Sequence, residues 1–214
     1  YILILGMVNL TISLAADIVA YKLVNLGPKL LPGAPLIFPL TYIIGDIVTE
    51  VYGYNVAKKI IWLTLVCELF FVIAVKLIIH VPSPIFWHQQ SSHNEANPFL
   101  RFVLLGIFAV ISSSFINIYI ISKLKIFMKG KHFWLRSLGS SAFSGFVLVL
   151  VTILIGFSGN IQGPKVIYLI LSVYSIEVLY SLLGVWPASI ITAFLKLEEQ
   201  LDIYDTKTDF NPFK

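Results

Sequence analysis

Two acidic residues in this sequence stand inside an apolar stretch, at a spacing that suits a binding site. Asp46 and Glu50 lie four residues apart, and Tyr42 precedes Asp46 by the same interval, so a helix would align all three on one face. Two carboxylates one turn apart repel each other when both are ionised, so at least one must be protonated, paired or occupied by a ligand. Packing between helices is the alternative, but the carboxylate pair favours a site.

Polar residues also recur at helical spacing in three other apolar stretches. They are Asn9, Ser13, Asp17 and Tyr21 in the first, Ser113, Ser114 and Asn117 in the second, and Tyr174, Glu177 and Ser181 in the third. We expect these three stripes, and the one formed by Tyr42, Asp46 and Glu50, to face a common cavity. For the serines, interhelical hydrogen bonds worth about 0.6 kcal/mol each are the favoured interpretation. Asp17 and Glu68 are equally compatible with a place near a bilayer surface.

The composition indicates that these residues are held by membrane-spanning helices. Hydrophobic residues make up 58% of the 214 residues and charged residues 12%, against roughly 45–50% and 25% in soluble domains. A mean hydropathy of +0.90 along the whole chain indicates a polytopic protein rather than a soluble domain with one anchor. The predicted fold class is an all-α membrane protein with six transmembrane helices, near residues 2–24, 35–52, 58–80, 99–122, 137–157 and 166–194.

Proline and glycine interrupt the second of these predicted helices. Pro35, Pro39 and Gly45 lie within it, which favours a broken or partly re-entrant helix, and such irregular helices line the working site of many membrane proteins. We place a transmembrane domain at residues 1–196 and a polar, cytoplasmic C-terminal tail at residues 197–214.

Basic residues concentrate on one predicted side of the membrane. Ten of the fifteen Lys and Arg residues fall in or beside the connections after the second and fourth helices, in the tail, or at Lys196 directly before it, so the positive-inside rule places both termini in the cytoplasm. Residues 81–98 have no helical apolar period and are expected to form an exposed loop. We attribute the net charge of +4 to this topology and expect no nucleic-acid partner.

Enzyme motifs are absent from the sequence. There is no His-Glu-x-x-His, no Gly-x-Ser-x-Gly and no glycine-rich phosphate loop. The four histidines lack the spacing of a metal site, and the single cysteine, Cys67, leaves no pair for a disulfide. We therefore expect no enzymatic activity, no cofactor and no metal ion.

Several motifs resemble one transporter family. The run from Phe38 to Gly53, with Phe-Pro, then Asp46, then Glu-Val-Tyr-Gly, is followed by the basic pair Lys58 and Lys59. Together they resemble the queuosine precursor transporter family, also called YhhQ or VUT. Further matches, which extend the resemblance over nearly the whole chain, are Asn117 to Tyr119, Lys123 to Lys125, Phe133 to Ser137, Ser140 and Ser141, Asp202 to Asp205, Thr208, and Phe210 to Phe213.

The resemblance implies a multi-pass importer in the bacterial inner membrane, similar in outline to the substrate-binding subunits of ECF transporters. Its substrate would be a 7-deazaguanine base, preQ0, preQ1 or queuine, taken up for salvage into tRNA queuosine. The sequence departs from the family pattern at Leu148, where an aspartate is expected, and at Glu177, where a lysine is expected. The alternatives are the binding subunit of a multi-component vitamin or nucleobase transporter and a membrane assembly protein without a solute. The sequence is compatible with a homodimer, and the lipid bilayer is the other expected partner.

The expected substrate-binding residues are Tyr42, Asp46, Glu50, Asn117, Ser140, Tyr174, Glu177 and Trp186. A carboxylate can accept the two adjacent N–H groups of the base, an aromatic ring can stack on its face, and an amide or hydroxyl can donate to its carbonyl. Glu177 would supply a countercharge for the basic arm of preQ1 or queuine, which neutral preQ0 lacks. The broken second helix is the expected moving part, and both proton-coupled and facilitative transport stay open.

Overall fold

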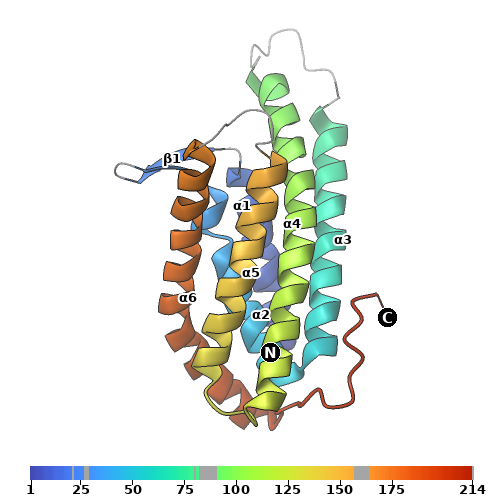
Figure 1. The fold of residues 1–214 in the computed structure, drawn as a ribbon. Coiled ribbons are helices and arrows are strands. Elements are labelled where there is room, and N and C mark those ends of the chain that lie inside the picture. Colours follow the sequence, from blue (N-terminus) through green and yellow to red (C-terminus); the bar gives the residue numbers. More distant parts are fainter. Residues whose placement is uncertain (21, 27–28, 80, 82–90, 157–163, 214) are drawn as a thin grey trace.

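The computed structural model describes residues 1–213 except 21, 27–28, 80, 82–90 and 157–163, and these form a helical bundle with one small β-hairpin (Figure 1). The helices are α1 Ile2–Val19, α2 Pro39–Tyr52, α3 Tyr54–Ile79, α4 Ser91–Phe127, α5 Phe133–Gly156 and α6 Pro164–Glu199. The predicted all-α membrane fold is confirmed.

Five helices within the described part of the chain, α1, α3, α4, α5 and α6, are long and apolar enough to cross a membrane. Large apolar side chains on them point outward, and those exposed by 60% or more include Leu3, Phe70, Leu77, Leu154 and Leu183. A bundle that exposes leucine and phenylalanine all around it has its apolar surface covered by lipid rather than by protein. The chain is therefore a multi-pass membrane protein.

The remaining helix, α2, is short and lies inside the bundle, where it contacts all five others. Eleven of its 14 residues are buried, including Asp46 and Glu50. A 3-10 turn, η1 at Ala34–Leu36, precedes it, and Gly53, with φ at +81°, ends it directly before α3. The helix predicted near residues 35–52 is thus shorter than expected, but α2 is continuous from Pro39 to Tyr52 and the expected interruption within it is not observed.

Several predicted helix boundaries differ from the structure. The first helix ends at Val19 instead of residue 24, because the chain turns into strands β1 Leu23–Leu26 and β2 Lys29–Pro32, which pair antiparallel with Leu23 opposite Pro32. The sequence contains Gly-Pro in this stretch, a dipeptide that favours turns, and this signal was not used when the apolar run was assigned to one helix. The hairpin projects from the bundle at the end away from the chain termini (Figure 1).

The predicted loop at residues 81–98 is also corrected, since α4 already begins at Ser91; residues 82–90 of that prediction lie outside the described residues. The sixth helix likewise continues past the predicted residue 194 to Glu199.

Both chain ends lie at the same end of the bundle, together with the α2–α3 junction and the α4–α5 turn (Figure 1). The N-terminal ammonium of Tyr1 forms an ion pair of 2.9 Å with Glu199 at the end of α6. Residues 200–213 then fold back on α2 and α3. The Tyr54 hydroxyl donates to the carbonyl of Phe210 at 2.9 Å, and Trp62 Nε1 donates to the carbonyl of Pro212 at 2.8 Å.

Candidate substrate-binding site

Asp46 lies at the centre of a buried hydrogen-bond network between α2, α4 and α5. Its Oδ1 accepts from Asn117 Nδ2 at 2.6 Å, and its Oδ2 accepts from the hydroxyls of Ser137 at 2.5 Å and Ser141 at 3.0 Å. The Ser144 hydroxyl donates to Asn117 Oδ1 at 3.0 Å. Both oxygens of Asp46 are thus occupied by protein donors, and its role is to orient Asn117.

Glu50 belongs instead to a charge cluster, made of Glu50, Lys125, Arg136, Lys196 and Asp202. Arg136 donates to both oxygens of Glu50, at 2.5 and 3.0 Å, and Lys196 Nζ adds a third hydrogen bond at 2.6 Å. Lys125 Nζ donates to the backbone carbonyl of Glu50 and to Asp202 Oδ1, each at 2.6 Å. The cluster ties α2 to α4, α5, α6 and the tail.

Asp202 is the member of the charge cluster that follows the last helix, and its carboxylate is held by two lysines. Its Oδ1 lies 2.6 Å from Lys125 Nζ and 2.8 Å from Lys196 Nζ. Partial burial disfavours its ionised form, but the hydrogen bonds from the two lysines outweigh this effect, so the pKa of Asp202 lies below its usual value. The carboxylate therefore stays ionised and keeps the tail in place at neutral pH.

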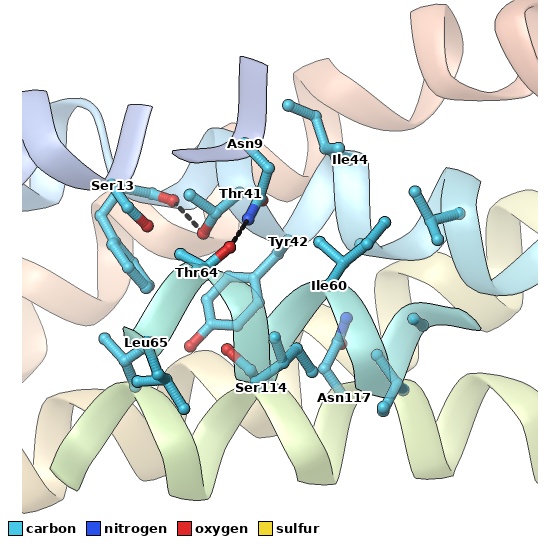
Figure 2. Close-up of a pocket in the computed structure, with 17 residues that line it drawn as sticks. Asn9, Ser13, Thr41, Tyr42, Ile44, Ile60, Thr64, Leu65, Ser114 and Asn117 are labelled. Atoms are coloured by element: carbon cyan, nitrogen blue, oxygen red, sulfur yellow. Dashed lines mark hydrogen bonds between the residues drawn. The ribbon is translucent and has the colours of Figure 1, made fainter. Parts of the chain in front are cut away.

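A small cavity of about 40 Å³ lies beside the Asp46 network, between α1, α2, α3 and α4 (Figure 2). We call it the hydroxyl cavity, because its polar lining residues are Asn9, Ser13, Thr41, Tyr42, Thr64, Ser114 and Asn117. The Tyr42 ring points into it, and its buried hydroxyl has no hydrogen-bond partner within the described part of the chain. Asn9 Nδ2 donates to Thr64 Oγ1 across it at 3.3 Å. No residue that lines this cavity carries a charge.

A second cavity, of about 110 Å³, has a different character. We call it the acidic cavity, because Asp17 of α1 and Glu177 of α6 line it among mainly apolar residues. Leu148 lines it as well, so the two positions that depart from the family pattern face the same space. Phe38 and Val110 line both cavities, which makes the cavities direct neighbours.

The structure separates the eight predicted site residues into two groups. Tyr42 and Asn117 line the hydroxyl cavity, Glu177 lines the acidic cavity, and Asp46 supports Asn117 from behind. The other four, Glu50, Ser140, Tyr174 and Trp186, line neither cavity. Ser140 donates to the Ser137 carbonyl at 3.1 Å, Tyr174 packs edge-on against Phe146 at 5.5 Å, and the Trp186 side chain is 76% exposed on the outer face of α6.

Sequence reasoning missed some of the lining residues. Phe38, Thr41 and Thr64 were not proposed for the site, and Ser114 was assigned to a stripe but not to binding. The four-residue spacing of Asn9 and Ser13 did point to the hydroxyl cavity, which both residues line. Thr64 had no comparable signal, because it is a single hydroxyl in a long apolar helix.

These features define a class of protein. Polar cavities enclosed by membrane-spanning helices, beside a short buried helix that carries carboxylates, are typical of membrane transport proteins. Among the described residues, no group of three His, Cys, Asp or Glu side chains could hold a metal ion.

The chain belongs to the family described as Putative vitamin uptake transporter, whose family model matches residues 32–191. The matched range runs from the end of β2 into α6 and therefore includes the whole of α2, α3, α4 and α5. The resemblance stated from the sequence motifs is thereby confirmed. No curated protein and no solved structure matches the chain.

Proposed function

We propose that this protein imports a queuosine precursor, a 7-deazaguanine base, across the bacterial inner membrane for salvage into tRNA. The observation that carries the proposal is the hydroxyl cavity, whose wall offers uncharged donors and acceptors beside an aromatic ring. A flat, neutral heterocycle with amide-like edges needs this combination. Family membership supports uptake as the activity.

Asn117 has the hydrogen-bonding capacity that such a base requires. One of its two amide hydrogens is used on Asp46, and one of the two lone pairs of Oδ1 accepts from Ser144. One donor and one acceptor remain, held in a fixed orientation by these two contacts. Paired with the unpartnered Tyr42 hydroxyl, they match the alternating donors and acceptors on the edge of a guanine-like base.

The described conformation is closed around this cavity. A volume of about 40 Å³ is close to that of one water molecule, roughly 30 Å³, and is much smaller than a bicyclic base requires. The charge cluster fixes the end of α2 to three other helices, so that end is shut by ion pairs. Entry of the base therefore requires α2 to separate from its neighbours, as alternating access describes.

The distribution of basic residues supports one orientation of the protein in the membrane. Basic residues gather in the first turns of α3, in the last turn of α4 and in the α4–α5 turn, at the end that carries both termini; they include Lys58, Lys59, Lys123, Lys129 and Lys131. The positive-inside rule supports a cytoplasmic location for this end. The closed, ion-paired end of α2 would then be the cytoplasmic gate.

The test is uptake by bacterial cells that neither synthesise nor otherwise import queuosine precursors, with queuosine in their tRNA as the readout. Expression of this chain alone is expected to restore queuosine when preQ0, preQ1 or queuine is supplied. Tyr42→Phe removes only a hydroxyl without a partner and is expected to reduce uptake at least about tenfold, because the base loses a buried hydrogen bond. Trp186→Phe, on the lipid-facing side, is the matched control.

Absence of uptake despite normal amounts of protein in the membrane would contradict the proposal. If uptake is equal for the wild type and Tyr42→Phe, the hydroxyl cavity is not the binding site for the base. Import by this chain alone also distinguishes a self-sufficient importer from a binding subunit that needs an ATP-driven partner.

A further inference from the structure

Glu177 is a buried carboxylate to which the described residues offer no partner. It exposes 2% of its surface, and neither a hydrogen bond nor an ion pair involves its carboxylate within the part of the chain that the structure describes. It packs against α5, where a Cβ added to Gly145 would lie 3.5 Å from Oε2. An ionised carboxylate in such a place is unfavourable by several kcal/mol unless a cation or a proton neutralises it.

The acidic cavity gives that cation a place. Glu177 lines it from α6, and Asp17, whose buried Oδ2 also has no partner among the described residues, lines it from α1. None of the lining residues is a lysine, an arginine or a histidine. Among the described residues, Glu68 interacts electrostatically with Asp17 and Tyr42 with Glu177, and neither Glu68 nor Tyr42 can supply a positive charge.

The remaining lining restricts what the cation can be. Apart from Thr152 and the two carboxylates, the wall consists of apolar and small residues such as Ala20, Ala34 and Leu148. A bare metal ion needs several oxygen ligands in a compact shell, which this wall does not provide. An ammonium group on a carbon chain satisfies both parts of the lining, since its charge meets the carboxylates and its methylene groups meet the apolar surface.

The two cavities are adjacent, with Phe38 and Val110 in the wall of each. A molecule with a flat polar head and a basic side arm could therefore lie across them, its head among the hydroxyls and its arm toward Glu177. We infer that the acidic cavity binds the ammonium arm of the substrate and makes the protein selective for cationic over neutral 7-deazaguanines. The identity of the base rests on the proposed function, whereas the preference for a cation rests on the cavity itself.

The inference is tested by equilibrium binding to the purified full-length protein in lipid nanodiscs. The probes are preQ1, whose aliphatic amine is protonated at neutral pH, and preQ0, which has an uncharged nitrile in the same position. The wild type is expected to bind preQ1 at least about tenfold more tightly than preQ0. Glu177→Gln is expected to abolish most of this preference by weakening preQ1 alone. Glu198→Gln, a change of the same kind on an exposed side chain, is expected to keep it.

Equal affinities for the two probes, or a preference that survives in Glu177→Gln, would overturn the inference. Misfolding of Glu177→Gln is not expected to account for a loss of binding. Removing an unpaired buried charge should leave the unfolding temperature of the variant unchanged or higher. A lower unfolding temperature in Glu177→Gln would itself count against an unpaired carboxylate.

If neither base binds, the proposed function fails and the cavity is tested alone. The probes are then benzylamine and benzyl alcohol, which have similar shapes and differ in charge. Tighter binding of benzylamine that disappears in Glu177→Gln would retain a cation-selective cavity in a protein with another substrate. Equal binding of the two would overturn the inference together with the proposed function.

Discussion

The guanidinium of Arg136 at the start of α5 binds both oxygens of Glu50 on α2, and neither side chain is accessible to solvent. This pair is the core of the charge cluster, in which Lys196 and Lys125 bind the same glutamate from α6 and α4. It fixes one end of the central helix. The residues that the cavities use lie further along α2, toward Phe38.

Glu50→Gln is expected to destabilise the protein by about 3–5 kcal/mol, because it leaves the buried Arg136 without its countercharge. The measurement is thermal or denaturant unfolding in a fixed detergent, with the exposed Glu198→Gln as the control. Unfolding of Glu50→Gln that coincides with the wild type would show that the ion pair does not stabilise α2. Because of this effect, Glu50 is unsuitable as a probe of substrate binding.

Attachment of the tail is expected to depend on pH through Asp202. Its pKa is lower in the folded protein than in the unfolded chain, so its contribution to stability is complete above about pH 4 and is lost as the pH falls through the folded value. Hydrogen exchange of residues 200–213 should therefore accelerate in the wild type as the pH decreases below 4, after correction for the intrinsic rate. In Asp202→Asn the exchange should already be fast at pH 6. A corrected rate in this variant that is slow at pH 6 and increases only below pH 4, as in the wild type, would exclude this role.

Gly53→Ala is expected to destabilise the α2–α3 junction by at least about 1 kcal/mol. Gly53 has φ at +81°, which side chains other than glycine adopt only with strain. An added Cβ would also lie 2.9 Å from Ile203 Cγ2, so the tail must shift to accept it. Unfolding measurements would report the strain. Gly139→Ala is the control, since nothing lies within 4 Å of a Cβ added there.

Trp62→Phe is expected to loosen the last residues of the tail without affecting the bundle. The substitution removes the Nε1 donor that binds the Pro212 carbonyl at 2.8 Å and keeps much of the apolar contact with Phe213. Limited proteolysis should cut the tail several times faster than in the wild type, while the unfolding temperature changes little. Trp186→Phe, on the lipid-facing surface, should leave the cutting rate unchanged.

The sequence allowed the fold class to be predicted, and three of the eight expected binding residues, Tyr42, Asn117 and Glu177, line one of the two cavities. Spacing by four residues correctly grouped Tyr42 with Asp46 on one face of a helix, and it placed Asn9 and Ser13 on the face of α1 that lines the hydroxyl cavity. It could not separate the roles of Asp46 and Glu50, because the partners that decide them are distant in the chain. Arg136 lies 86 residues from Glu50, and Lys196 lies 146 residues from it.

Trp186 and the β-hairpin show a second limit of prediction from the sequence. In a membrane helix the lipid-facing and protein-facing sides are both apolar, so hydropathy does not reveal that Trp186 points outward. The same apolar character continued the first predicted helix through Leu23–Leu26, although the chain there forms a strand. Pairing with Lys29–Pro32 decides that structure, and it is a contact between segments rather than a property of either one.

The burial of α2 has a consequence for biosynthesis. At 14 residues the helix is about 21 Å long, shorter than the roughly 30 Å hydrocarbon core, and it carries two carboxylates whose insertion each costs about 2.5–3.5 kcal/mol. The side chains that compensate this cost, among them Asn117, Arg136 and Lys196, are synthesised later than α2. A segment from the first quarter of the chain therefore reaches its final place only after the last helix has entered the membrane, so the centre of the bundle is completed last.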